Sequence, residues 1–154
     1  MNSSKITGTG TFIPSLKKEN ADFLEDEFLN NDGSTFSSDN NVIIEKFKAI
    51  TGITERRYAK DEYTTSDLAF FAAQKSIEDA NLNKEELDYI IVAHNFGDIK
   101  DDNKRTDIVP SLAARVKYKL GIINPDTVAY DLPFGCPGWL QAVIQADYFI
   151  KSGD

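Results

Sequence analysis

The feature that most limits the possible folds is an unbroken apolar run in the middle of the chain, Tyr89-Ile90-Ile91-Val92-Ala93. A strand of this composition has no polar face, so it is typical of a parallel sheet covered by helices on both sides. A second strand-like segment, residues 127–132, lies further along, and helical patterns surround both segments. The order strand, helices, strand, helix, strand, helix predicts an α/β fold with a mainly parallel sheet.

Local signals set the expected boundaries of these elements. Lys5 to Ile13 looks like a first strand that Pro14 stops. Apolar spacing and capping residues predict helices over 20–30, 42–50, 64–80, 112–120 and 140–150. We expect a single domain over 1–154, with an insertion at roughly 23–40 and a long polar loop at roughly 96–109.

The expected first strand carries two glycines, Gly8 and Gly10, on one face. A Gly-x-Gly pair can open a nucleotide-binding loop, but no third glycine and no helix follow at the spacing that such a loop needs. We expect instead that a neighbouring element packs closely against this face of the strand.

Two of the expected helices have predictable faces. In the helix at 42–50, the spacing places four residues on the buried side: Val42, Ile43, Phe47 and Ile50. In the helix at 112–120, Arg115, Lys117 and Lys119 form a basic face that we expect to be solvated. A smaller basic spot, Arg56 and Arg57, follows the first of these helices.

The only cysteine of the chain, Cys136, lies between the second strand-like segment and the last helical one. Pro137 suits the first turn of that helix, which places Cys136 on a tight strand-to-helix turn. Unpaired N–H groups and the positive end of the helix dipole there favour a thiolate, the nucleophilic form of cysteine. Gly135 and Gly138 would let a substrate approach the backbone closely. A lone cysteine can equally be a small buried hydrophobe, so both interpretations stay open.

Other candidate residues lie where a parallel sheet places its functional sites, beyond the carboxyl ends of the strands. His94 and Asn95 follow the apolar run 89–93, just as Cys136 follows the segment 127–132. We therefore take His94, Asn95 and Gly138 as candidate substrate-binding residues. A Cys136–His94 dyad is the less favoured arrangement, because a histidine at a strand end is more often an ordinary polar neighbour.

Composition excludes several classes of function. The 154 residues carry a formal net charge of −8, which argues against nucleic acid and anionic membranes as partners. One cysteine and one histidine argue against a metal site or an internal disulfide, and suit a reducing compartment. No apolar run has the length of a membrane span, and the N-terminus has no signal-peptide pattern. We expect a cytoplasmic protein without a cofactor.

The last expected helix is apolar nearly all round, and its first charged side chain is Asp147. Such a helix is normally buried on every side. With three expected strands and no following element, little is left to cover its second face. We therefore expect the chain to be incomplete, either a fragment or half of an assembly.

The ordered motifs of the chain resemble a known family. The matching pieces run from residues 6–10 with Pro14 through 51–57, 65–69, 88–93, 110–111 and 120–121 to Asp131–Gly138, then 146–147 and 150–153. In this order the sequence is similar to the N-terminal half of a β-ketoacyl-acyl-carrier-protein synthase III, in the thiolase superfamily. The resemblance implies a thiolase-like half, with helices on both faces of its sheet, that lacks its last strands.

The resemblance also implies a chemistry. Cys136 would take an acyl group from a thioester, which then condenses with a malonyl-type carrier thioester as carbon dioxide is lost. The backbone N–H of Cys136 would be one donor to the thioester oxyanion. The catalytic histidine and asparagine of the family lie in the second half, and His94 is not at that histidine position. The implied partners are an acyl-carrier protein or an acyl-coenzyme A thioester, a second copy in a homodimer, and the missing C-terminal half or a partner chain.

The sequence departs from the family at several positions. Lys46 and Ile50 stand where family members that prime from coenzyme A have a tryptophan and an arginine, so coenzyme A priming is in doubt. Val109 stands where a phenylalanine often closes the acyl pocket, so a larger acyl group is expected. A catalytically idle binding or assembly module on the same fold, or a different thioester acyltransferase or hydrolase, remains an alternative.

Overall fold

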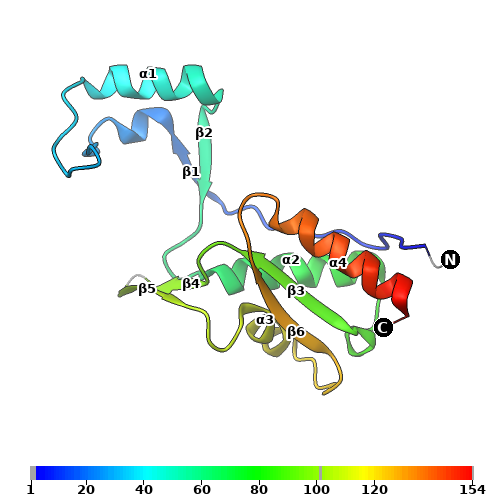
Figure 1. The fold of residues 1–154 in the computed structure, drawn as a ribbon. Coiled ribbons are helices and arrows are strands. Elements are labelled where there is room, and N and C mark those ends of the chain that lie inside the picture. Colours follow the sequence, from blue (N-terminus) through cyan, green and yellow to red (C-terminus); the bar gives the residue numbers. More distant parts are fainter. Residues whose placement is uncertain (1–2, 101, 154) are drawn as a thin grey trace. The chain divides into compact units, whose positions relative to one another are not determined.

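The computed structural model describes residues 3–100 and 102–153. The chain divides into two compact units, Ile13–Lys60 and a larger unit formed by Met1–Phe12 with Asp61–Asp154 (Figure 1). The expectation of a single domain over 1–154 therefore stays a prediction. No helix in the described part of the chain is long and apolar enough to cross a bilayer.

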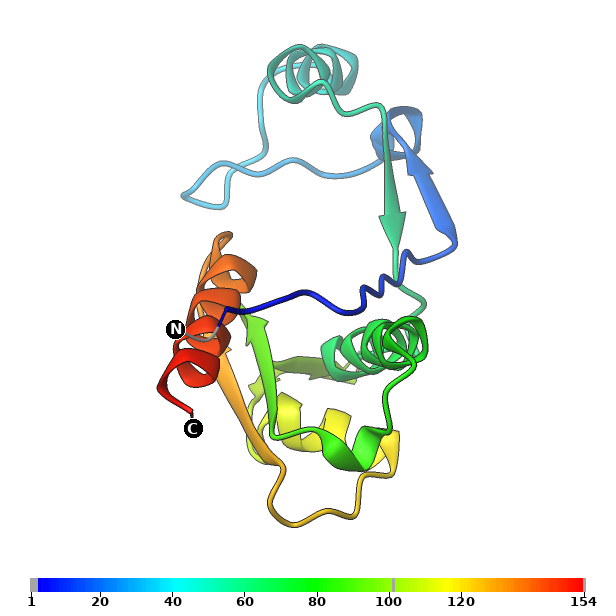
Figure 2. The same cartoon turned by 90° about the vertical axis from the view of Figure 1, so that its right-hand side faces the viewer.

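The larger unit is built around two parallel strands, β3 (Tyr89–His94) and β6 (Val128–Pro133). Their register runs from Tyr89 opposite Val128 to His94 opposite Pro133. Helices α3 (Leu112–Leu120) and α4 (Gly138–Ser152) lie on opposite sides of this pair, as Figure 2 shows. The predicted α/β arrangement, with a parallel pair between helices, is confirmed.

The core of the larger unit lies under α3, which packs between the strand pair and α2 (Thr65–Ala80). Leu112, Ala113 and Val116 are fully or almost fully buried, since they share the inner face of α3. Helix α2 begins with a capping box of Thr64 and Asp67, and a short turn, η2 (Lys84–Glu86), leads from it into β3. The capping residues that predicted the helix over 64–80 therefore do cap α2.

The expected first strand is wrong, because residues 3–13 form no ladder with another strand. Their polar backbone groups bond to α2 instead: Thr9 N–H donates to Asp79 at 2.8 Å, and Lys75 donates to the Thr11 carbonyl at 2.9 Å. The close packing expected at Gly8 and Gly10 is confirmed. A Cβ on either residue would collide with backbone atoms of α2.

The segment expected as a loop over 96–109 contains an antiparallel hairpin. Strand β4 (Asp98–Lys100) pairs with β5 (Asn103–Asp107), with an irregularity between Asp98 and Lys100. Alternating polar residues do not signal a buried strand, so the sequence pattern did not reveal the hairpin.

The smaller unit consists of a two-stranded ribbon and a helix. Strand β1 (Leu16–Glu19) pairs antiparallel with β2 (Glu55–Tyr58), and α1 (Asn40–Thr51) lies between them in sequence. The expected helix at 42–50 is confirmed as α1, capped by Asp39 and ended by Gly52 in the left-handed conformation. The expected helix at 20–30 is wrong, since only a 3₁₀ turn, η1 (Asn20–Phe23), forms there.

The buried face of α1 also differs from the expected one. Ile43 is buried as predicted, but its neighbour Ile44 is the other buried residue, whereas Val42, Phe47 and Ile50 are exposed. The buried stripe of α1 is therefore narrower than the spacing predicts, although η1 packs on the helix and the Phe28 ring lies 6.1 Å from the Phe47 ring.

Candidate active site

Cys136 lies on the turn that joins β6 to α4, and it is exposed. The turn is held at both ends by backbone hydrogen bonds. Phe134 N–H donates to the His94 carbonyl at 3.0 Å, and Gly138 N–H donates to the Gly135 carbonyl at 2.9 Å. The predicted strand-to-helix turn is therefore confirmed, while the role of Cys136 as a nucleophile stays a prediction.

The backbone around Cys136 leaves a donor available. Within the described residues, the N–H of Cys136 donates to no other group. Gly135 has open space where a Cβ would stand, so a ligand can approach the chain there. Gly138 is buried, and a Cβ would lie 3.1 Å from the Ala93 Cβ, so this glycine lets α4 begin directly against β3. Its predicted contact with a substrate has no support in this geometry and stays a prediction.

His94 ends β3, and only 7% of it is exposed. Gly97 N–H donates to its Nδ1 at 2.9 Å, so the ring hydrogen lies on Nε2, which donates to Asp131 at 3.1 Å. Both ring nitrogens are thus engaged, and neither bonds to Cys136. The Cys136–His94 dyad, already the less favoured arrangement, does not form in the described structure.

Asp131 joins three elements near the carboxyl ends of the strands. Besides His94, its carboxylate accepts the N–H groups of Leu112 at 2.7 Å and Ala113 at 2.8 Å, and so caps α3. Ser111 completes the cap by accepting the Ala114 N–H. Sequence reasoning missed this role, although a carboxylate inside an apolar strand was the available signal.

Another carboxylate, that of Asp98, is buried and ties the hairpin to the two helices α2 and α3. It is 3% exposed and accepts the Ser66 N–H, the Ser66 hydroxyl and the Arg115 guanidinium, each at 2.7 Å. Arg115 also bonds Asp107 at 2.8 Å. The hydrogen bond that Arg115 donates to Asp107 raises the pKa of Arg115; burial works to lower that pKa, and the interaction with Asp98 also raises it. Sequence reasoning missed Asp98 because its partners are distant in the chain.

The basic face of α3 is not simply solvated, which corrects the sequence expectation. Arg115 is held by the two carboxylates, and Lys117 donates to the Thr127 carbonyl at 2.7 Å. Lys119 forms an ion pair with Asp67. These long side chains reach groups on α2, on the hairpin and before β6, and so fasten α3 on its polar side.

The remaining predicted site residues are exposed. Asn95 lies on the turn after β3, and Val109 lies between β5 and α3 with 80% of its surface exposed. Its part in an acyl pocket stays a prediction.

Helix α4 presents a large apolar face to solvent. Of its residues, Gly138 is buried, whereas Trp139, Leu140 and Tyr148 are 70%, 53% and 65% exposed. The sequence predicts a helix buried on every side, whereas the described residues leave part of the apolar surface of α4 exposed.

Comparisons with known proteins extend this picture, although no family model matches the chain. It is 38% identical over 150 residues to "Beta-ketoacyl-[acyl-carrier-protein] synthase III 1" of Vibrio cholerae. Its structure is similar to those of 3-oxoacyl-[acyl-carrier-protein] synthase III from Aquifex aeolicus, at 33% identity and a TM-score of 0.68, and β-ketoacyl-[acyl-carrier-protein] synthase III from Thermus thermophilus, at 32% and 0.70.

All three matches include nearly all of this chain but less than half of the other protein. Each includes 97% of this chain, but only 40% of the Vibrio protein, 41% of the Aquifex chain and 39% of the Thermus chain. This chain thus spans about two fifths of the length of its relatives.

Proposed function

We propose that Cys136 is the acyl-accepting nucleophile of a condensing acyltransferase. The ground for this proposal is the correspondence between this chain and the N-terminal portion of thiolase-fold β-ketoacyl-[acyl-carrier-protein] synthase III-like proteins. The observation that carries the proposal is the position of Cys136. It is exposed on the turn that enters α4, at the edge where the strands β3 and β6 both end. A helix N-terminus favours the thiolate by its unpaired N–H groups and its dipole.

In the first step, the Cys136 thiolate attacks the carbonyl carbon of an acyl thioester. The carbonyl electrons move to oxygen, and the oxyanion can accept the free N–H of Cys136. When the carbonyl re-forms, the carbon–sulfur bond to the carrier breaks and the carrier leaves as a thiolate. Cys136 then holds the acyl group as a new thioester.

In the second step, a malonyl-type thioester loses carbon dioxide, and the electron pair of the broken bond attacks the acyl carbon on Cys136. A carbon–carbon bond forms, and the Cys136 thiolate is released unchanged. In the family that the chain resembles, a histidine and an asparagine of the second half serve this step. We therefore propose that residues 1–154 alone give no condensation product, and measurable ketoacyl product from this chain would overturn that statement.

The substrates and partners belong to the same proposal. The acyl donor is an acyl-carrier-protein or coenzyme A thioester. Coenzyme A is the less favoured donor, because the exposed Lys46 and Ile50 on α1 stand where family members that prime from coenzyme A have a tryptophan and an arginine. The apolar faces of α4 and β6 would be covered by the second half or by another copy in a homodimer. A cytoplasmic location fits these partners. With Val109 in place of a bulkier side chain, a series of acyl donors should favour chains longer than acetyl.

A thiol-reactivity experiment separates this proposal from an idle assembly module. Because Cys136 is the only cysteine, one iodoacetamide adduct in the intact mass reports on it alone. We expect the folded chain at pH 7 to react at least tenfold faster than glutathione, and the urea-unfolded chain to lose this advantage. Equal rates in the folded and unfolded chain would favour the idle module.

A different thioester acyltransferase or hydrolase would share the reactive cysteine. The lifetime of the acyl group on Cys136 distinguishes a hydrolase from a condensing enzyme. A hydrolase releases the free acid within minutes, whereas a condensing enzyme keeps the acyl group until an acceptor arrives.

A further inference from the structure

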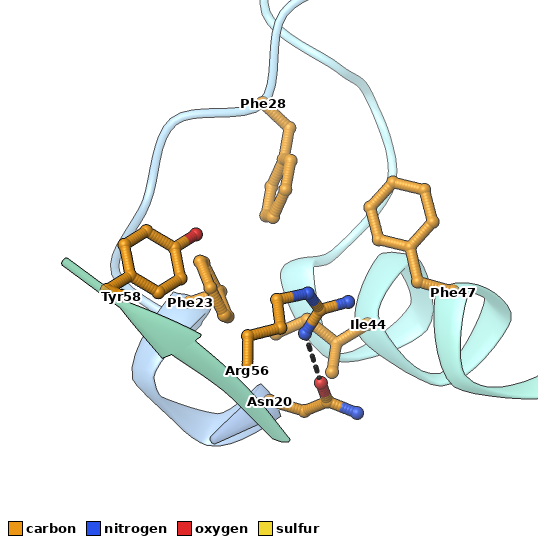
Figure 3. A pocket seen from close by; sticks show the side chains of 7 residues that line it. All are labelled: Asn20, Phe23, Phe28, Ile44, Phe47, Arg56 and Tyr58. Atoms are coloured by element: carbon orange, nitrogen blue, oxygen red, sulfur yellow. Dashed lines mark hydrogen bonds between the residues drawn. The ribbon is translucent and has the colours of Figure 1, made fainter. Parts of the chain in front are cut away.

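The smaller unit contains a pocket that has no part in the proposed acyl transfer. Its volume is about 200 Å³. Figure 3 shows side chains from η1, α1 and β2 converging on it, with the Arg56 side chain among aromatic rings. It is lined by Asn20, Phe23, Phe28, Ile44, Phe47, Arg56 and Tyr58. Most ligand pockets have this composition, an apolar wall with a few polar groups that fix the orientation of the ligand.

Among the described residues, Arg56 is the one charged residue that lines this pocket. It is half-buried, and its Nη1 donates to the Asn20 Oδ1 at 2.8 Å. Asn20 is itself fixed, because its amide donates to the Ile53 carbonyl at 2.9 Å. The Arg56 guanidinium also lies 5.4 Å from the centre of the Phe23 ring, within the range of a cation–π interaction. The guanidinium is therefore held in place.

Among the residues that the structure describes, no Asp or Glu lies within ion-pair distance of Arg56. A guanidinium offers five N–H donors, and the bond to Asn20 uses one of them. A half-buried charge without a counter-ion is costly, so an anion that reaches Arg56 is favoured.

The other face of the β1–β2 ribbon shows the contrast. There Lys17 bonds Glu19 at 2.8 Å and Glu55 at 2.9 Å, and Arg57 bonds Glu55 at 3.2 Å. The hydrogen bonds that Lys17 donates to Glu19 and Glu55 raise its pKa to about 12. That face carries two cations and two carboxylates.

The two charged residues on the pocket face of the ribbon are both cations. Lys18 lies directly opposite Arg56 in the ribbon, and residues opposite each other share a face. No carboxylate of the described residues pairs with Lys18 either. In a chain with a net charge of −8, this is a local positive site beside an aromatic wall.

We propose that this pocket binds a small organic carboxylate with an aryl or short alkyl body. The carboxylate accepts N–H groups of Arg56 in the bidentate geometry that guanidinium groups favour, and the apolar body lies against Phe28 and Phe47. The site is independent of Cys136, since all its lining residues belong to the smaller unit.

The test begins with two probes of nearly equal shape, phenylacetate and its neutral analogue phenylacetamide. Binding to the 154-residue chain is followed by ¹⁵N–¹H NMR shifts at pH 7. We expect saturable shifts of α1 and β2 amides with phenylacetate, and at least tenfold weaker binding of phenylacetamide. Equal binding of both probes, or no saturable binding of phenylacetate, would overturn the proposal without any variant.

A matched pair of variants then assigns the charge. Arg56→Gln removes the pocket cation, and Arg57→Gln removes an equal charge from the opposite face of the ribbon. We expect Arg56→Gln to weaken phenylacetate binding at least tenfold and Arg57→Gln to change it less than twofold. Equal losses in both variants would show only a non-specific attraction and would overturn the assignment. If Arg56→Gln proves unfolded by its NMR spectrum, the comparison of the two probes decides alone.

Discussion

The two units of the chain use their charged side chains in different ways. In the larger unit, Asp98, Arg115 and Lys119 are partly or wholly buried, and each is paired with groups on other elements. In the smaller unit, Arg56 is half-buried and has no carboxylate partner among the described residues. Paired charges fix the ends of helices and strands, whereas an unpaired charge remains available to a ligand.

The units also differ in burial. The larger one has a core of fully buried side chains, with Leu112 and Ala113 at 0% exposure, while the smaller one buries Ile43 and Ile44 incompletely. Few buried contacts imply low local stability, so amides of the smaller unit should exchange with solvent faster. The candidate nucleophile thus lies in the better-packed unit, and the proposed carboxylate pocket lies in the looser one.

The largest effect should come from Asp98→Asn, which keeps the shape of the side chain but removes its charge. The Ser66 groups and Arg115 would lose a shared acceptor in a buried place, so urea unfolding should show a loss of about 3–5 kcal/mol. Asp107→Asn is the control, since it bonds the same arginine from an exposed position and should cost less than about 1 kcal/mol. Equal costs would remove the contrast between paired buried charges and surface charges.

The next effect is steric. In Gly10→Ala, the new Cβ would collide with the Ala72 carbonyl on α2, which cannot move aside. Residues 3–12 should no longer pack on α2, and the free energy of unfolding should fall by about 1–3 kcal/mol. Gly135→Ala meets no atom within 4 Å and should leave the stability unchanged. Were Gly10→Ala equally neutral, the N-terminal segment would not pack on α2 as described.

A smaller loss is expected from Asp131→Asn. The amide keeps one acceptor but cannot serve His94 and both N–H groups of α3, so the free energy of unfolding should fall by about 1–2 kcal/mol. Asp126→Asn, at an exposed position five residues earlier, provides the control. A neutral Asp131→Asn would mean that the cap of α3 does not depend on this carboxylate.

The smallest effect should appear in the pH dependence. Partial burial works to raise the pKa of Asp67, but the bonds from Lys119 and Thr64 outweigh it and hold that pKa below its usual 3.8. A lowered folded-state pKa gives stability that is present above about pH 4 and is lost as the pH falls through the folded value. Lys119→Gln should reduce this acid sensitivity, as measured by thermal unfolding between pH 5 and pH 2. An unchanged slope would contradict the pairing.

Much of the larger unit could be predicted because its signals are local. The apolar run of β3, the capping residues of α2 and α3, and the proline and glycines around Cys136 each act within a few positions in sequence. The wrong expectations concern segments whose partners are distant. Residues 5–13 have the composition of a strand, but their backbone groups bond to side chains of α2 some 60 or 70 positions away.

The polar contacts of the site were unpredictable for the same reason. Asp98 binds Ser66, and His94 binds Asp131, across separations of 32 and 37 residues. A hydrophobic or capping pattern that spans ten or fifteen positions cannot predict pairs of residues so far apart in the sequence. The turn of Cys136 was found from local sequence, whereas the network that fixes the surrounding elements needed the three-dimensional structure.

The measurement that tests the central claim most directly is acyl transfer to Cys136. The chain is incubated with a hexanoyl thioester of N-acetylcysteamine, and intact mass is recorded with and without Cys136→Ser. We expect one hexanoyl adduct that maps to Cys136 and is absent from the variant. No adduct, or the same adduct on Cys136→Ser, would contradict the assignment of Cys136 as the acyl-accepting nucleophile.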